Sequence, residues 1–499
     1  FSAAKGDIAF TPDGRRIVIH GDGKIRFWDT DGDAGKTFDS GRAHKIAFDP
    51  NGRFIFSASS LGKADVIDSA TGNSLELSSF EDSEWFVQSG KNGFDCSSGG
   101  RGSVVFVKGL TCYQPDQFWD SFFTPGLLPR FLGAEAISEA DLNAAAAKAP
   151  RVRISPENEL KTDRESITIR VTAKGDSGVG RIFLYHNGRV IDENTRGITV
   201  KQSGEYRDFT VVLDDGVNSF VGAAYDRSNA AEGRSGKLLV TFTAKKIVRP
   251  DMYIVSAGVS SYRDSNIRLG SPDSDARAFA ETLSKTAAPL YGKVHQTVLV
   301  NDGASKEKIV SALNEVASKC RNTDTVVIYL AGHGDTDNGS YYYLPYDADI
   351  TSLASTSVGV ADLGALIQKI PAGKVALFLD TCKSGSAVRD LGKLAFARGF
   401  EERKAIANLA KSRGIAVFSA ANDTQSAYEI SELKHGIFTW CFIEAMTNRR
   451  SELLYGGEIP VSRLISVIER MTRETAAKYL QAEQSPIHYA FGDDFALGK

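Results

Sequence analysis

The spacing of apolar residues divides the chain of 499 residues into two halves with different patterns. Up to about residue 245, apolar and polar residues alternate in short runs with a period of two, which is typical of half-buried strands. From Val248 onward, apolar runs such as Asp324–Leu330 and Lys374–Asp380 are separated by stretches with a helical period, such as Lys306–Lys319. The first half is therefore predicted to be all-β, and the second half to be an α/β domain with a largely parallel sheet.

A repeat occurs within the first 130 residues. The segment Ile8–Arg15 recurs as Ile46–Arg53, 38 residues later, and each copy contains a Pro-Asp-Gly or Pro-Asn-Gly turn. A period near 40 residues with such turns is typical of propeller blades. The Trp28-Asp29 dipeptide resembles the signature of WD-repeat proteins, and a weaker third copy runs from Trp85 to Gly93. The resemblance implies a partial WD-type β-propeller over residues 1–135, with unrelated meander hairpins as the alternative.

A closed propeller needs about four or more blades, which is more than these residues supply. We therefore expect further blades from elsewhere in the protein or from another chain. The chain begins at Phe1, without an initiator Met or a signal-like segment, which suggests a processed product or a fragment.

An Ala-rich linker at 136–150 separates this region from a second all-β stretch. Residues 151–245 return to short alternating runs, with His186-Asn187-Gly188 as a tight hairpin turn. This pattern predicts an immunoglobulin-like β-sandwich. Nothing in it indicates a ligand, so a spacer is the default interpretation. Residues 246–499 form the α/β domain.

Composition and charge exclude several classes of protein. Apolar residues make up 42% of the chain, enough for several hydrophobic cores. The net charge is −3 and there is no sustained basic run, so nucleic acid is not expected as a partner. The apolar runs are strand-length, far below the ~20 residues that span a bilayer, so no membrane span is expected.

The five cysteines are scattered and contain no Cys-x-x-Cys pair, so neither a disulfide framework nor a metal site is predicted. Cys96 and Cys112 flank a glycine-rich segment and could form one bridge. The other three, Cys320, Cys382 and Cys441, lie in apolar patterns typical of reduced thiols. The compartment stays open, with the cytoplasm slightly favoured over export.

Two apolar strands end in residues suited to nucleophilic catalysis. Val326–Ala331 runs into Gly332-His333-Gly334, and Val375–Leu379 runs into Asp380-Thr381-Cys382. Functional residues of open α/β sheets gather at the carboxyl ends of strands. If the two strands are neighbours, His333 and Cys382 meet at one edge of the sheet.

This pairing supplies the parts of a cysteine nucleophile. An imidazole can take the thiol proton and later protonate a leaving amine. The main-chain N–H groups of Gly334 and Cys382 could form an oxyanion hole. A lone His or Cys is more commonly a packing or surface residue, but the two together at paired strand ends make a His333–Cys382 dyad the leading hypothesis.

These motifs resemble those of the caspase-like cysteine peptidases, specifically the bacterial relatives of metacaspases, called orthocaspases. The resemblance covers Val248–Lys499 and rests on four ordered segments: Tyr329–Gly334, Leu379–Gly385, Phe418–Ala421 with Gln425–Glu429, and His435–Thr439. It implies an endopeptidase with His333 as general base and acid and Cys382 as nucleophile. The propeller, sandwich and peptidase together also resemble a recurrent bacterial arrangement, in which the first two serve as recognition or regulatory modules.

The resemblance further implies protein or peptide substrates with Arg or Lys before the scissile bond. Metacaspases bind that side chain with one Asp two residues before the nucleophile and another at the start of the first helix, which match Asp380 and Asp275. Two carboxylates pair well with one buried cation. The alternative for Asp275 is a helix N-cap, and Asp273 is the nearest competitor for the pocket role.

The segment after His333 departs from the metacaspase pattern, because it lacks the longer acidic stretch of calcium-activated members. Four aspartates remain nearby, namely Asp335, Asp337, Asp347 and Asp349. We favour a solvated acidic loop over a calcium site, and no cofactor is required. Lys383 stands where many relatives have His, and its charge could lower the cysteine pKa or face solvent.

Ser386–Arg413 is rich in Arg and Lys, and we expect self-cleavage there if the enzyme matures by processing. Its Ser386–Gly399 half is predicted to be an exposed loop. The competing interpretation is that these basic residues only solubilise the surface.

Two other functional classes fit parts of the pattern. A caspase-like scaffold without activity could act by protein–protein interaction through the propeller, but the intact His333–Cys382 pair argues against it. A hydrolase of small thioesters or amides would use the same dyad, but this function would not explain the presence of Asp275 and Asp380.

Overall fold

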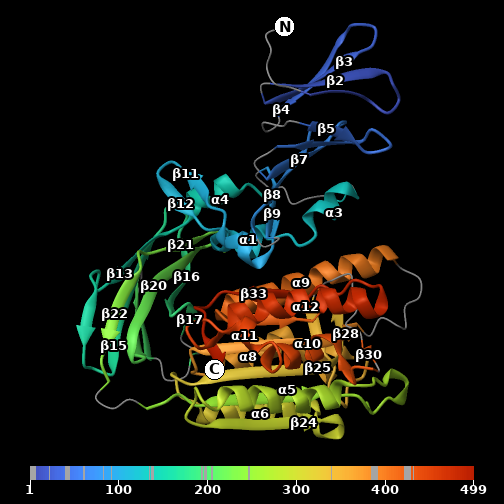
Figure 1. Ribbon diagram of the computed structural model, residues 1–499. Coiled ribbons are helices and arrows are strands. Elements are labelled where there is room, and N and C mark those ends of the chain that lie inside the picture. The colour runs from blue at the N-terminus through green and yellow to red at the C-terminus, as the bar shows by residue number, and fades with distance from the viewer. Residues whose placement is uncertain are drawn as a thin grey trace. The chain divides into compact units, whose positions relative to one another are not determined.

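The computed structural model in Figure 1 describes most of the chain. At residues 34, 39, 202–203, 392–399 and 429, and at Cys382 and Lys383, the description covers the main chain only. The chain divides into two compact units, one of Phe1–Ala149 with Asp226–Glu232 and one of Pro150–Tyr225 with Gly233–Lys499. None of the helices in the described residues is long and apolar enough to span a membrane. Outside the description lie residues 1–6, 22, 40–44, 60–61, 82–83, 91–92, 134, 136–139, 193–194, 196–198, 204–205, 245–247, 339, 384–391, 421–428 and 431.

The first unit contains two large antiparallel sheets and the small β11–β12 pair. One has the strand order β1-β2-β3-β4, and the other has the order β10-β9-β8-β7-β6-β5. The strands are β1 Asp7–Phe10, β2 Arg16–Gly21, β3 Lys24–Asp29, β4 Ala34–Asp39, β5 Lys45–Phe48, β6 Phe54–Ala58, β7 Lys63–Asp68, β8 Ser74–Ser79, β9 Trp85–Ser89 and β10 Gly93–Cys96.

The two strong copies of the sequence repeat occupy equivalent places in these sheets. Each copy supplies the first strand, β1 or β5, and the turn that follows it. Gly14 and Gly52 both have φ of +69° in that turn, a left-handed conformation that glycine adopts without strain. Residues of both sheets share one hydrophobic core: Val18, Ile25, Phe27, Ile46, Ile55 and Ile67.

The weaker third copy does not begin a third sheet, because β9 and β10 extend the second one. The described residues show several β-sheets but no closed propeller, so the WD-type assignment stays a prediction. No disulfide joins Cys96 to Cys112, so the bridge considered from the sequence is wrong. The rest of the unit consists of α1 Ser98–Gly102, β11 Phe106–Lys108, β12 Thr111–Tyr113, η2 Pro115–Phe118, α2 Trp119–Phe122, α3 Leu127–Leu132 and α4 Leu142–Lys148.

The second unit begins with a β-sandwich of two sheets that share one hydrophobic core. One sheet has the order β13-β15-β19-β18 and the other has the order β14-β22-β20-β16-β17, with β21 paired to β20. Asn187 and Gly188 join strands β16 and β17. Their φ values of 50° and 76° form the tight hairpin turn that the sequence predicts. The strands are β13 Arg151–Ser155, β14 Leu160–Thr162, β15 Ser166–Lys174, β16 Val179–His186, β17 Arg189–Ile191, β18 Thr199–Ser203, β19 Tyr206–Val212, β20 Gly216–Asp226, β21 Glu232–Arg234 and β22 Leu238–Phe242.

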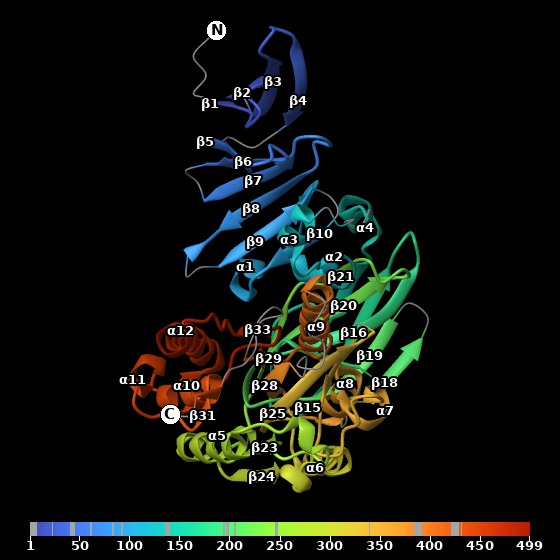
Figure 2. The same cartoon turned by 90° about the vertical axis from the view of Figure 1, so that its right-hand side faces the viewer.

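The rest of the second unit is an α/β domain with a central sheet of order β24-β23-β25-β28-β29-β33. The first five strands are parallel and β33 is antiparallel to β29. Figure 2 shows α5, α10 and α12 on one face of this sheet and α6, α8 and α9 on the other. The sheet is built of β23 Met252–Gly258, β24 Val294–Val300, β25 Thr325–Asp337, β28 Lys374–Lys383, β29 Ala416–Ser419 and β33 Ile487–Ala490.

The helices and minor elements follow the predicted alternation with the strands. They are η3 Ser265–Ile267, α5 Pro272–Ala287, η4 Asn301–Gly303, α6 Lys306–Lys319, β26 Ser340–Tyr343, α7 Leu353–Thr356, β27 Val358–Gly359, α8 Val360–Lys369, α9 Gly392–Arg413, β30 Glu429–Ile430, β31 His435–Gly436, α10 Ile437–Met446, α11 Arg450–Leu453, β32 Ile459–Pro460, α12 Val461–Leu480 and β34 Ala496–Gly498.

One expectation is wrong here. Gly392–Gly399, assigned to an exposed loop, belongs to α9. The residues between the two glycines are mostly strong helix formers such as Lys, Leu, Ala and Arg, which outweighs the cost of the glycines. The preceding part of the expected cleavage segment, residues 386–391, lies outside the described residues.

The sandwich packs against the α/β domain through a buried cation. Arg189 of β17 is 3% exposed, and its Nη2 donates to the main-chain carbonyls of Ile370 and, at 3.2 Å, of Ile367 at the end of α8. Burial lowers the pKa of Arg189 to about 10. A cation is favourable at a helix C-terminus, where carbonyls lack partners within the helix. The Gln368 side chain also donates to Thr195, at 3.2 Å.

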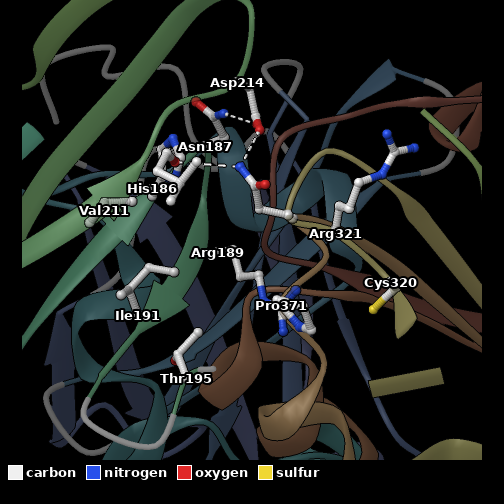
Figure 3. A pocket seen from close by; sticks show the side chains of 13 residues that line it. His186, Asn187, Arg189, Ile191, Thr195, Val211, Asp214, Cys320, Arg321 and Pro371 are labelled. Carbon is white, nitrogen blue, oxygen red and sulfur yellow. Dashed lines mark hydrogen bonds between the residues drawn. The ribbon is translucent and has the colours of Figure 1, made fainter. Parts of the chain in front are cut away.

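A cavity of about 240 Å³ lies at the same junction (Figure 3). Asp214 of the sandwich lines it and accepts hydrogen bonds from Asn187 and from Asn322 of the α/β domain, both at 3.1 Å. These contacts make the sandwich part of one packed unit with the α/β domain.

Arg189→Gln should lower the free energy of unfolding of the second unit by about 1–3 kcal/mol, because it leaves buried carbonyls of α8 without donors. Urea denaturation followed by far-UV circular dichroism measures this. Arg170→Gln is the matched control, since the exposed Arg170 pairs with Asp208 within the sandwich alone, and it should change little. If both variants lost the same free energy of unfolding, the contact between Arg189 and the end of α8 would not stabilise the second unit as proposed.

Candidate active site

The two strands that carry His333 and Cys382 are neighbours in the sheet. β25 and β28 run parallel from Thr325 beside Lys374, and their register places His333 directly beside Cys382. The same register sets Ala331 beside Asp380. The main chains of the two residues singled out from the sequence therefore meet at the carboxyl edge of the sheet.

The imidazole of His333 is oriented by a main-chain carbonyl. His333 is 7% exposed, and its Nε2 lies 3.0 Å from the carbonyl oxygen of Ile267, in the short helix η3. A carbonyl can only accept, so Nε2 carries the hydrogen in this contact. In the neutral ring, Nδ1 is then the nitrogen that can accept a proton. Sequence reasoning missed Ile267, because a main-chain carbonyl leaves no signal in residue type.

Asp380 is buried and held by two hydroxyl groups. Its Oδ2 accepts from Thr439 Oγ1 at 2.7 Å and from Tyr329 Oη at 3.1 Å. Burial, together with the nearby carboxylates of Asp380 and Asp275, holds the pKa of Tyr329 well above its ordinary value. Tyr329 therefore stays protonated and can donate.

Asp275 does not cap its own helix, because α5 has Ser271 at the N-cap position. Its Oδ1 lies 2.5 Å from His435 Nδ1, and its Oδ2 accepts from the main-chain N–H of Gly436 at 3.1 Å. Gly436 is the N-cap of α10. Asp275 therefore joins the start of α5 to the start of α10.

The competitor Asp273 has a different set of partners. Its carboxylate accepts from Ser260 Oγ at 2.5 Å and from Asn301 Nδ2 at 3.1 Å, which ties α5 to the loops after β23 and β24. Of the two aspartates, Asp275 is the one near Tyr329, and through it near Asp380.

The four aspartates considered for calcium make separate local contacts. Asp347 accepts from the N–H of Lys306 at the start of α6, and Asp349 accepts from Thr351. Asp335 accepts from the next N–H in the chain, and Asp337 from the Asn338 side chain. Among the residues that the structure describes, no three His, Cys, Asp or Glu side chains gather as a metal site would need.

The comparisons with known proteins identify part of the chain. The family model described as the caspase domain matches residues 256–490. This match supports a caspase-like domain in the C-terminal part of the protein. No curated protein matches the chain.

Three solved structures are distantly similar to parts of the chain. A crystal structure of a Geobacter sulfurreducens protein is 18% identical, with a TM-score of 0.34, over 48% of this chain and 93% of that one. A titin M4 structure is 12% identical, with a TM-score of 0.16, over 19% and 97%. The twitchin kinase region of C. elegans is 13% identical, with a TM-score of 0.17, over 21% and 18%.

Burial separates the cysteines into reactive and unreactive classes. Cys441 is buried, and burial raises its pKa to about 11, so its thiol stays protonated at neutral pH. Cys96 and Cys320 are also buried, whereas Cys112 is exposed.

Iodoacetamide at neutral pH should therefore label Cys112 in the native protein and label Cys96, Cys320 and Cys441 at least about tenfold more slowly, because the reagent reaches a buried thiol poorly. Peptide mapping by mass spectrometry measures each rate, with protein unfolded in urea as the control for equal intrinsic reactivity. Fast native labelling of Cys441 would contradict its buried placement.

Proposed function

We propose that the protein is a cysteine endopeptidase with Cys382 as nucleophile and His333 as general base and acid. The observation that supports this most directly is the register of β25 and β28, which sets the two residues side by side. The Ile267 carbonyl adds to it, because by engaging Nε2 it leaves Nδ1 of His333 as the nitrogen for the thiol proton.

In this proposal the Cys382 thiol gives its proton to Nδ1 of His333, and the thiolate attacks the carbonyl carbon of the scissile peptide bond. The N–H groups of Gly334 and Cys382 would hold the oxyanion. When the C–N bond breaks, the imidazolium returns its proton to the departing amine and a thioester remains on Cys382. Water, deprotonated by the same imidazole, then hydrolyses the thioester and restores the thiol.

We further propose that Asp380 and Asp275 select Arg or Lys before the scissile bond. Both carboxylates are buried, and both act on the same phenol, Tyr329. A substrate cation placed near them would be favoured, and an acidic side chain would be repelled. The sandwich and the N-terminal sheets would then serve as recognition or regulatory modules.

Cys382→Ala should lower kcat/KM for peptide cleavage by at least about 1,000-fold, because the covalent step is lost, and His333→Ala should do the same. A fluorogenic peptide assay measures this. Cys112→Ala, which removes an exposed thiol, is the control and should keep full activity. If the Cys382→Ala protein kept a tenth of the wild-type rate, Cys382 would not be the nucleophile.

Cleavage of a positional peptide library should require Arg or Lys before the scissile bond. Asp380→Asn or Asp275→Asn should weaken transition-state binding of such substrates by about 2–4 kcal/mol, because one carboxylate facing the cation is lost. Alkylation of Cys382 by iodoacetamide should change far less. Asp273→Asn is the matched control on the same helix and should keep the preference.

A library profile that favours Asp or a bulky apolar residue would overturn this specificity. Wild-type protein that cleaves no member of the library, with or without calcium, would support the alternative of a caspase-like scaffold that acts by protein–protein interaction.

A further inference from the structure

Glycine precedes and follows His333, and each glycine makes room for a tyrosine hydroxyl. A Cβ built at Gly332 would lie 2.6 Å from Tyr262 Oη, and a Cβ at Gly334 would lie 2.7 Å from Tyr341 Oη. Both distances are shorter than carbon–oxygen contacts allow. The two glycines therefore let two phenols approach the strand closely on either side of the histidine.

The first phenol fixes the main chain of His333. Tyr262, in the loop after β23, accepts a hydrogen bond from the His333 N–H at 2.7 Å. The two rings lie 5.3 Å apart, centroid to centroid.

The second phenol reaches the neighbouring strand. Tyr341 belongs to β26, which pairs with the end of β25, and its Oη lies 2.8 Å from Thr381 Oγ1 in β28. Thr381 is the residue before Cys382. Tyr341 is 1% exposed, and burial holds its pKa well above the ordinary value, so the phenol stays neutral.

Tyr341 makes these contacts from the face of the sheet away from Asp380. Side chains alternate along a strand, so Thr381 points to the face opposite to that of Asp380. Tyr341 therefore has no route to a substrate bound beside Asp380. Its hydroxyl occupies the space beside Gly334, a proposed oxyanion donor, and lies within hydrogen-bond distance of Thr381, next to the proposed nucleophile.

We propose that Tyr341 is a positioning residue that fixes the relative placement of Gly334 and Cys382. The proposal rests on the peptidase function proposed above. Its physical basis is that reacting groups must be held to a fraction of an ångström, and a displacement of about 1 Å can cost about 100-fold in rate. One buried hydroxyl that touches both strands opposes such a displacement.

The same strand supplies a matched control. Tyr343 is as fully buried as Tyr341, and its Oη donates to the carbonyl of Ala331 at 3.0 Å, in the strand with which β26 already pairs. Tyr341→Phe and Tyr343→Phe each remove one buried hydroxyl, and we expect similar losses of stability from both.

Tyr341→Phe should lower kcat about tenfold with little change in KM, whereas Tyr343→Phe should keep kcat within about twofold of wild type. Thr381→Val should reproduce the effect of Tyr341→Phe from the other side of the contact. The double variant should be no slower than either single variant, because both changes break one hydrogen bond.

A second measurement needs no substrate. The rate of Cys382 alkylation against pH should change in Tyr341→Phe and Thr381→Val but not in Tyr343→Phe, because the thiol and imidazole would no longer be held in register. Equal kcat values for the two Phe variants, or additive effects of Tyr341→Phe and Thr381→Val, would overturn the proposal. A wild-type protein without peptidase activity would refute the proposed function instead, and the alkylation profiles would still test the positioning role.

Discussion

The candidate active site depends on the pairing of β25 with β28. Ten consecutive residue pairs, from Thr325 beside Lys374 to Gly334 beside Lys383, run through the centre of the sheet, and nearly all of the described side chains in them are buried. Side chains alternate between the two faces, so a slip of one residue would move every buried side chain of one strand to the opposite face. The packing of this central pair therefore fixes the register, and the register brings His333 beside Cys382.

The sequence predicted those parts of this arrangement that follow from the spacing of apolar residues. Both strands are nearly continuous runs of apolar residues, which is typical of parallel strands buried on both faces. Their polar ends then marked the candidate site. The contacts that orient the site could not be predicted in this way. The Ile267 carbonyl is a main-chain group, and the hydroxyl of Tyr341 meets Thr381 only because β26 folds back beside β25.

Two other parts of the fold could not be predicted from residue patterns: the start of α9 and the contact between the sandwich and α8. The segment before Glu401 has no clear helical period, yet helix formers around Gly399 extend α9 back to Gly392. The alternation along the sandwich strands predicts strands but not the contacts at the ends of those strands, so the sequence indicates only a spacer. Arg189 was indistinguishable from a surface arginine until the fold placed the end of α8 against it.

The start of α10 connects both aspartates of the proposed specificity pocket. Gly436, the N-cap of this helix, donates its N–H to Asp275, and Thr439, in the first turn, donates its hydroxyl to Asp380. The N-terminus of a helix carries a partial positive charge that favours nearby carboxylates in their ionised form. One helix end therefore holds two buried carboxyl groups, one from α5 and one from β28. In the proposed peptidase, the placement of α10 thus positions both carboxyl groups of the pocket, while the pairing of β25 with β28 determines the geometry of the dyad.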